Sequence, residues 1–187
     1  MQVLVLCTAN RCRSPLGEHL LAQAWRDAAQ QDRGLVVRSA GLLPGGSTAD
    51  PLTAAAGAEL GVDLTGHVSR QLDKDMLRQT DLLIAMERRH LREAAVLHPP
   101  VLTTAFTLPE LVRRGRAAPR RPPAPVPIWL RGLATGRDLR DLARSDPDDE
   151  IADPVGRPAE AHRAAAARLR DLMADVVGLL LPRTGSA

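Results

Sequence analysis

Along this chain, short continuous runs of hydrophobic residues take turns with segments in which hydrophobic residues recur at helical spacing. Residues 2–6 form a continuous aliphatic run of strand length, and apolar residues then recur at helical spacing over residues 15–29. Further strand-length runs occupy residues 35–38, 82–86 and 101–105. Helical patterns recur over residues 51–60, 73–80, 87–97, 109–114 and 158–181. Strands that alternate with helices predict an α/β protein whose parallel sheet is covered on both faces.

One segment interrupts this rhythm. Proline and arginine dominate residues 113–127, which predicts an extended, solvated loop. Such a loop is either an insertion without a role or a docking site for an acidic partner or lid. We expect a single domain over residues 1–181, with an insertion at about residues 113–149, and a flexible tail over residues 182–187.

Composition narrows the classes of function. Of 187 residues 44% are hydrophobic, the net charge is +3, and Lys74 is the only lysine, so nearly all cations are arginines suited to planar oxyanions. Aromatic residues make up 2% of the chain, too few to stack nucleic-acid bases, so we expect no nucleic-acid partner. The opening apolar run is too short for a secretory signal or membrane span. Two cysteines provide no disulfide framework, and we therefore expect a cytoplasmic protein without a membrane partner.

Candidate chemistry lies directly after the first predicted strand. Cys7 stands at the strand's carboxyl end, and a short loop leads to a helix that starts near Ser14 and Pro15. Backbone N–H groups of such a loop, together with the positive end of the helix, form a concave site for an oxyanion. The same field, with Arg13 six positions along, favours the thiolate of Cys7 and makes it a nucleophile.

The nine residues CTANRCRSP, 7–15, resemble the C-x5-R-[ST]-P loop of the low-molecular-weight protein tyrosine phosphatases. Similar residue types recur in the same order at residues 38–41, 50–51, 67–70 and 81–86. The resemblance covers residues 1–112 and 150–181, and the insertion between them is longer than the family usually carries. It implies a three-layer fold around a four-stranded parallel sheet in the order 2-1-3-4.

The resemblance also implies roles for the loop residues. Cys7 attacks phosphorus and forms a cysteinyl-phosphate, while Arg13 holds the transferring oxygens. Ser14 hydrogen-bonds the sulfur, and the side chain of Asn10 fixes the loop backbone. The expected substrate-binding residues are Thr8, Ala9, Asn10, Arg11, Cys12 and Ser14.

Residues outside the nucleophile and its arginine have more than one interpretation. Cys12 resembles the inner thiol that traps an oxidised nucleophile as a disulfide, and it is equally consistent with a small buried hydrophobe. Asp153 precedes a proline, as in the family's acid loop, and is expected to act as general acid and base, with Asp146 in reserve. His67 and Arg70 are expected to support the loop by hydrogen bonds.

The predicted activity is hydrolysis of a phosphomonoester to inorganic phosphate, with a phosphotyrosine protein or a small phosphoester as substrate. The family's pocket aromatics are replaced by residues 42–46 and by Val155, and Trp129 is the aromatic expected near the mouth. The alternatives are an arsenate reductase that uses an external small thiol and a catalytically inactive phosphate-binding module. No metal-ligand spacing or nucleotide motif is present, so we expect no metal and no cofactor.

Overall fold

The architecture is that of a computed structural model, which describes residues 1–28, 34–119, 121 and 124–181. Four strands form its sheet: β1 (Gln2–Cys7), β2 (Val36–Gly41), β3 (Leu82–Ala85) and β4 (Ala105–Thr107). The α-helices are α1 (Arg13–Ala28), α2 (Pro51–Ala58), α3 (Lys74–Arg78), α4 (Arg88–Leu97), α5 (Leu108–Ala117), α6 (Val126–Ala134) and α7 (Ala159–Leu180). Short 3-10 helices are η1 (Pro99–Thr103), η2 (Leu139–Ala143) and η3 (Pro147–Asp149).

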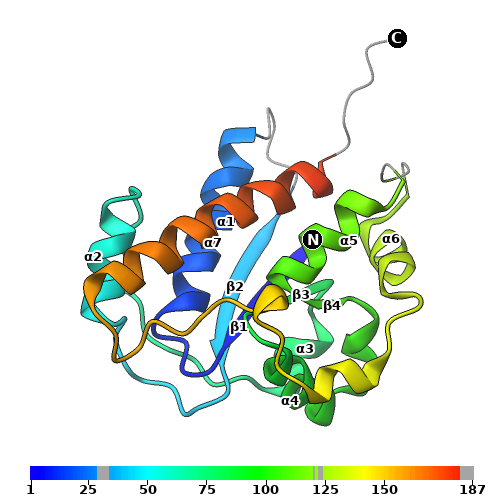
Figure 1. Ribbon diagram of the computed structural model, residues 1–187, viewed down its shortest axis with the longest axis horizontal. Helices are drawn as coiled ribbons and strands as arrows, with labels where there is room; N and C mark the ends of the chain where they lie inside the picture. Colours follow the sequence, from blue (N-terminus) through cyan, green and yellow to red (C-terminus); the bar gives the residue numbers. More distant parts are fainter. Residues whose placement is uncertain (29–33, 120, 122–123, 182–187) are drawn as a thin grey trace.

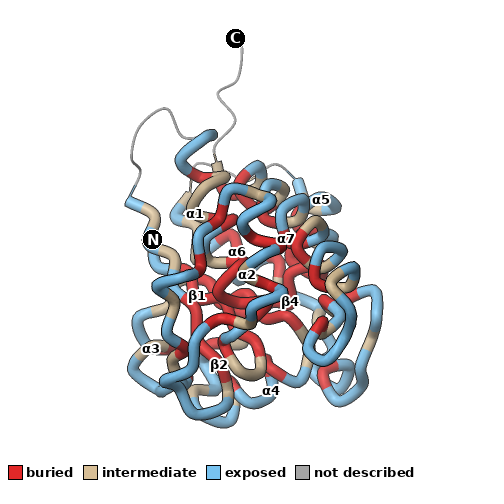
Figure 2. Tube along the Cα trace, turned by 90° about the vertical axis from the view of Figure 1, so that its left-hand side faces the viewer, coloured by how far each residue is buried: buried red, intermediate tan, exposed pale blue. Residues whose placement is uncertain are grey.

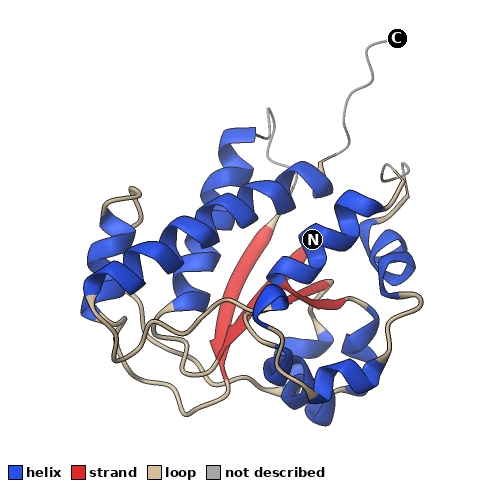
Figure 3. Ribbon diagram, in the orientation of Figure 1, coloured by secondary structure: helices blue, strands red, loops and turns tan. Residues whose placement is uncertain are grey.

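The four strands are parallel and lie in the order β2-β1-β3-β4. The central strand β1 is buried from Val3 to Cys7, as its uninterrupted apolar run requires. In Figure 3 the strands cross the middle of the molecule with helices above and below them. The fold class and strand order predicted from the sequence are confirmed.

Alternate side chains of β1 enter different halves of the core, as the period of a strand requires. Val3 and Val5 pack with residues of α1, α5, α6 and α7, while Leu4 and Leu6 pack with residues of α3, α4 and η2. Figure 1 shows α1 and α7 on one side of the sheet and α3 and α4 on the other. Figure 2 shows the buried positions gathered between these helical layers.

The fourth strand lies later than the sequence indicated. Residues 101–105 were expected to form it, but Pro99–Thr103 is a 3-10 helix and the strand is Ala105–Thr107. Pro99 and Pro100 fix φ near the helical value and start a tight turn, which moves the strand onward. Phe106 at its centre is fully buried.

The proline- and arginine-rich segment is more ordered than a solvated loop. Residues 113–117 continue α5, and residues 126–127 begin α6, which turns Trp129, Leu130 and Leu133 into the core. Trp129, the aromatic residue expected near the mouth of the pocket, is instead buried in the core. Positions 120 and 122–123 of this segment, and the expected tail at 182–187, lie outside the described residues.

The last helix of the described part, α7, packs against α1, α2 and α5. Its buried side is a stripe at helical spacing, formed by His162, Ala166, Leu169, Met173, Val176, Val177 and Leu180. Among the helices of the described part, none combines the length and apolarity needed to cross a bilayer.

Candidate active site

The loop after β1 lies where the carboxyl ends of β1, β2 and β3 meet, the edge at which open parallel sheets bind ligands. Its backbone packs closely on the end of β2. A Cβ atom at Gly41 would lie 2.6 Å from the backbone nitrogen of Asn10 and 2.7 Å from the carbonyl carbon of Ala9. Glycine at position 41 is therefore required for the loop to take this course.

The side chains of Cys7, Ser14 and Asn10 form one buried chain of contacts. The Cys7 Sγ lies 2.9 Å from the Ser14 Oγ. The Asn10 amide donates to that same Ser14 oxygen over 2.9 Å. The single hydroxyl hydrogen of Ser14 has two acceptors within reach, the Ala40 carbonyl at 3.2 Å and the Cys7 sulfur, and when donated to the sulfur it stabilises negative charge there.

Asn10 is the only described non-glycine residue with positive φ, at 53°, and its neighbours hold it there. Its amide donates to Ser39 Oγ over 2.8 Å, and its side-chain oxygen accepts from the Arg70 backbone N–H over 2.8 Å. The His67 Nε2 contacts the Asn10 carbonyl oxygen at 2.7 Å and is the donor of that pair. His67 and Arg70 thus both reach the loop at the same residue.

Arg13 is 2% exposed and crosses the site from the first turn of α1. One terminal nitrogen donates to Glu87 over 2.5 Å and to the Ile151 carbonyl over 2.9 Å. The other donates to Asp153 over 2.6 Å. Its buried Nε is without a partner among the described residues, so this N–H is free for the oxygen of a ligand.

Asp153 faces this arginine from the segment between η3 and α7 and is partly exposed. Its other oxygen accepts from the Val155 N–H over 3.2 Å, which fixes the turn around Pro154. Asp146, the reserve candidate, instead lies 2.9 Å from an Arg88 nitrogen and caps η3. Of the two candidate acids, only Asp153 contacts Arg13.

Glu87 was not predicted as a site residue and is the second carboxylate on Arg13. It also accepts from Arg89, whose Nε lies 2.6 Å from Glu87 Oε2. Burial raises the pKa of Glu87, but the hydrogen bonds from Arg89 and Arg13 outweigh it and lower that pKa to about 2. Glu87 is therefore an anion throughout the ordinary pH range and holds both guanidinium groups.

The hydrogen bonds of His90 define which way the Thr8 hydroxyl points. His90 is fully buried, and burial lowers its pKa to about 3, so the ring is neutral. Its Nδ1 accepts from the Glu87 N–H, so the single ring proton is on Nε2 and is donated to Thr8 Oγ1 over 3.1 Å. Arg89 donates to the same oxygen over 2.6 Å. Arg13 Nη2 also donates to this oxygen over 3.5 Å, and the Thr8 hydroxyl donates no hydrogen bond to a described residue.

Two loop side chains point elsewhere. The Arg11 side chain is exposed and donates to the Thr48 carbonyl, so only its backbone faces the loop. Cys12 is buried and free, and burial raises the pKa of its thiol to about 11. Cys12 is consequently a neutral thiol at physiological pH.

Comparison with known proteins identifies the family. The sequence profile of the low molecular weight phosphotyrosine protein phosphatases matches residues 2–114. The chain belongs to this family. It is 40% identical over 101 residues to the probable low molecular weight protein-tyrosine-phosphatase AmsI of Erwinia amylovora, covering 53% of this chain and 65% of that protein. It is 39% identical over 102 residues to Etp of Escherichia coli strain K12, covering 53% of this chain and 63% of Etp.

In these matches the chain spans slightly less than two thirds of each relative's length. Two solved structures align with a larger share of this chain. An arginine phosphatase, YwlE of Geobacillus stearothermophilus, is 27% identical with a TM-score of 0.68 over 95% of this chain and 90% of that one. The tyrosine phosphatase AmsI of Erwinia amylovora is 26% identical with the same TM-score over 96% and 93%.

The residues that sequence reasoning missed follow the third strand of this family fold. Glu87 and Arg89 come directly after β3, at the same sheet edge as the loop. That placement, with charged residues after a buried strand, was the available signal. Within the described ranges no three His, Cys, Asp or Glu side chains are grouped so as to hold a metal ion.

The neutral, buried His90 makes stability depend on pH. Below about pH 6.5 the unfolded chain protonates this histidine, while the folded chain does not until about pH 3. The contribution of His90 to the free energy of unfolding is therefore complete above pH 6.5 and falls by about 1.4 kcal/mol per pH unit as the pH drops through that window. Urea unfolding at several pH values measures this slope. His90→Gln should be less stable at pH 7 and show a shallower slope, whereas an unchanged slope would contradict the assignment.

Proposed function

We propose that this protein is a phosphomonoester hydrolase, most readily a protein-tyrosine-phosphatase, that acts through a cysteinyl-phosphate. The observation that carries the proposal is the convergence of Cys7, Arg13 and Asp153 on one loop, with a buried N–H of Arg13 left without an acceptor. A thiol, a guanidinium and a carboxylate are the nucleophile, charge stabiliser and proton carrier that phosphoryl transfer needs.

In the first step the Cys7 sulfur attacks phosphorus, and the bond between phosphorus and the ester oxygen breaks. Asp153 in its acid form gives its proton to the departing oxygen, and the loop amides with Arg13 hold the equatorial oxygens. In the second step the Asp153 carboxylate takes a proton from water, the water oxygen bonds to phosphorus, and the sulfur leaves as a thiolate. Ser14, 2.9 Å from the sulfur, stabilises that thiolate, and inorganic phosphate is released.

Asp153 and Glu87 both pair with Arg13 and neutralise its charge. An incoming phosphate oxygen takes the Nε and the terminal nitrogen that Asp153 occupies, while Glu87 keeps the opposite nitrogen in place. Displaced from the arginine, Asp153 is then free to meet the leaving-group oxygen.

The substrate proposal is a phosphotyrosine protein or a small aryl phosphoester. The tyrosine phosphatases AmsI and Etp among the relatives support it. Leu43 and Val155 are exposed aliphatic residues beside the loop and the acid segment, and they offer apolar contact to an aryl ring. An active cysteine thiol requires a reducing compartment, so we place the enzyme in the cytoplasm.

A second substrate class follows from the arginine phosphatase YwlE among the neighbours. The experiment is hydrolysis of para-nitrophenyl phosphate, of phosphotyrosine peptides and of phosphoarginine peptides by the purified chain. The proposal predicts phosphate release from the aryl ester and the phosphotyrosine peptide. Release from phosphoarginine alone would replace the substrate class, and arsenate reduction with a small thiol but no phosphate release would overturn the activity. Membership of the family does not favour the reductase or the inactive module.

We expect the Thr8 hydroxyl to contribute measurably to the affinity of the loop for a phosphate-like anion. Thr8→Val keeps the side-chain shape but removes the hydrogen that the loop offers to a phosphate oxygen. A hydrogen bond to a charged group contributes about 1.5–3 kcal/mol, so orthovanadate inhibition should weaken by roughly tenfold or more. Thr103→Val, whose exposed hydroxyl donates to the Pro100 carbonyl on η1, is the matched control and should leave inhibition unchanged. Equal inhibition of wild type and Thr8→Val would show that the hydroxyl points away from the anion.

A further inference from the structure

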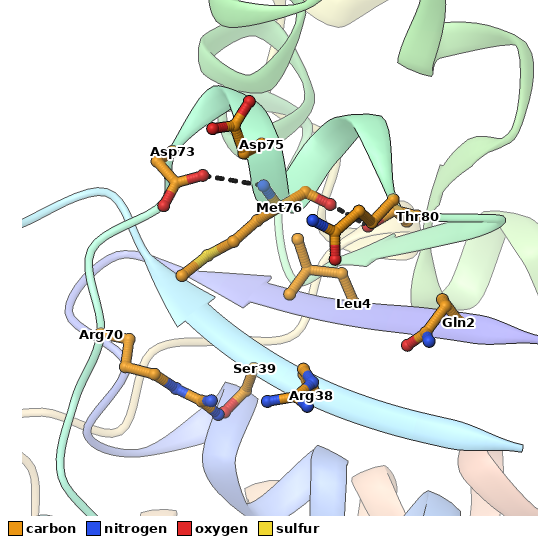
Figure 4. Close-up of a pocket in the computed structure, with 10 residues that line it drawn as sticks. Gln2, Leu4, Arg38, Ser39, Arg70, Asp73, Asp75, Met76 and Thr80 are labelled. Carbon is orange, nitrogen blue, oxygen red and sulfur yellow. Dashed lines mark hydrogen bonds between the residues drawn. The ribbon is translucent and has the colours of Figure 1, made fainter.

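A second hollow lies behind the loop, between β2 and α3. It is a cleft of about 360 Å³, within the range of small-molecule sites. Figure 4 shows Asp73 and Asp75 along α3 on one side, Arg38 and Arg70 on the other, and Leu4 between them. The cleft is separate from the position of Cys7, which does not line it.

The acidic and the basic side of the cleft differ in how many hydrogen bonds and ion pairs their side chains already make. Asp73 already accepts from the Met76 N–H as the cap of α3, and Asp75 pairs with Arg78 at 3.1 Å. By contrast, Arg38 has no side-chain hydrogen bond or ion pair with any described residue, and it is exposed. Arg70 has a single ion pair, with Glu18 at 3.6 Å, which is too long for a hydrogen bond. The guanidinium groups of Arg38 and Arg70 are therefore the groups in the cleft that could take an anion.

The remaining residues that line the cleft restrict the shape and the total charge of the anion. Leu4 and Met76 provide apolar surface between the walls, which suits a short hydrocarbon or aryl body. The carboxylates of Asp73 and Asp75 repel a second negative charge, so a dianion or a polyanion is disfavoured. The planar guanidinium of an arginine binds a carboxylate through two parallel hydrogen bonds.

The arginine wall is bonded directly to the catalytic loop. The Arg70 backbone N–H and the Ser39 hydroxyl both hold the side chain of Asn10, the loop residue with positive φ. Ser39 also donates to Glu18, the residue that Arg70 pairs with. A ligand that draws the Arg70 side chain from Glu18 therefore acts on a residue that is linked to Ser14. The Arg70 backbone N–H bonds to Asn10, and Asn10 bonds to the Ser14 hydroxyl.

We propose that this cleft is a second ligand site, for a small monocarboxylate with an apolar body, and that it is coupled through Asn10 to anion binding at the loop. The coupling rests on the proposed function, because it requires the loop to bind an oxyanion. The site itself does not. Coupling is reciprocal, so each ligand changes the affinity of the other by the same factor.

Titration of the ¹⁵N-labelled full-length chain with phenylacetate tests the site. We expect saturable amide shifts at Leu4, Met76 and Thr80, with a dissociation constant of about 1 mM. 2-Phenylethanol, which lacks the charge, should bind at least tenfold more weakly. Arg38→Gln should also weaken phenylacetate binding about tenfold, while Arg163→Gln, an exposed arginine on α7, should not. The absence of saturable shifts, or equal shifts in Arg38→Gln, would overturn the site.

A second titration with saturating orthovanadate tests the coupling. We expect the phenylacetate dissociation constant to change about fivefold, with amide shifts that extend to Asn10. An unchanged constant, with vanadate visibly bound at the loop, would overturn the coupling. Failure of vanadate to shift any loop amide would count against the proposed function instead, and the shifts at Leu4 and Thr80 would still decide the cleft.

Discussion

Cys7→Ser is expected to lower the hydrolysis of para-nitrophenyl phosphate by roughly 10³-fold or more. A serine hydroxyl at this position is protonated at neutral pH, and among the described residues the side chain that contacts position 7 is the Ser14 hydroxyl, which is not a base. Its alkoxide would also be a poor leaving group in the second step. Steady-state rates of the purified variant measure the loss.

Cys12→Ser is the matched control for the loss of a thiol. Cys12 is buried with a pKa of about 11, so its neutral side chain carries no nucleophilic charge at physiological pH, and the substitution keeps the backbone amide of the loop. We expect Cys12→Ser to retain activity within about tenfold of wild type. Comparable losses in the two variants would indicate that loop integrity, and not the sulfur of Cys7, determines the rate.

Asp153→Asn is expected to slow poor leaving groups much more than good ones. General acid catalysis contributes about 10²–10⁴-fold, and this contribution matters only where the departing oxygen needs a proton. Hydrolysis of phenyl phosphate should therefore fall by about 10²-fold or more, while para-nitrophenyl phosphate should lose much less in its first step. Single-turnover rates for a series of aryl phosphates give the dependence on leaving-group pKa.

Asp146→Asn is the control for this carboxylate. Asp146 pairs with Arg88 and caps η3, away from Arg13, so its removal should leave the leaving-group dependence at its wild-type slope. If Asp146→Asn steepened that slope and Asp153→Asn did not, the acid would be assigned to the wrong aspartate.

The parts of the fold with strong local signals were predictable. The strand at residues 2–6 and the strand at residues 82–86 are continuous apolar runs, and each lies at the centre of the sheet with at most one residue of difference in its bounds. The helix that begins at residue 51 was also predicted, and the Asp50 side chain caps it by accepting from the N–H groups of Leu52 and Thr53. Local sequence decided these elements because propensity, period and burial agree there.

The insertion was mispredicted because its composition concealed its packing. Prolines at the start of α6 look like loop residues, although proline fits the first turn of a helix. The insertion also pairs with distant parts of the chain: Arg137 stacks 4.6 Å from the Phe106 ring centroid and pairs with the buried Glu110 at 2.9 Å. Those partners lie 31 and 27 positions away, beyond the reach of a local pattern.

Candidate site residues were named where a sequence motif carries them, whereas Glu87 and Arg89, which belong to no such motif, were missed. The loop of residues 7–13 carries its own spacing, so Cys7 and Arg13 could be named from it. Glu87 and Arg89 reach the loop because β3 lies beside β1, a pairing that depends on the whole sheet. The proton on His90 Nε2 depends on contacts with two separate segments and has no signature in sequence.

The central claim is that phosphorus becomes bonded to the sulfur of Cys7. In Asp153→Asn the water of the second step lacks its base, so the intermediate should accumulate during turnover of para-nitrophenyl phosphate. Quenching in denaturant at alkaline pH, where the P–S bond of S-phosphocysteine persists, followed by peptide mass spectrometry should find one phosphoryl group on the peptide that contains Cys7. Continued turnover of that variant with no phosphoryl group on Cys7, or with the group on another residue, would contradict the account.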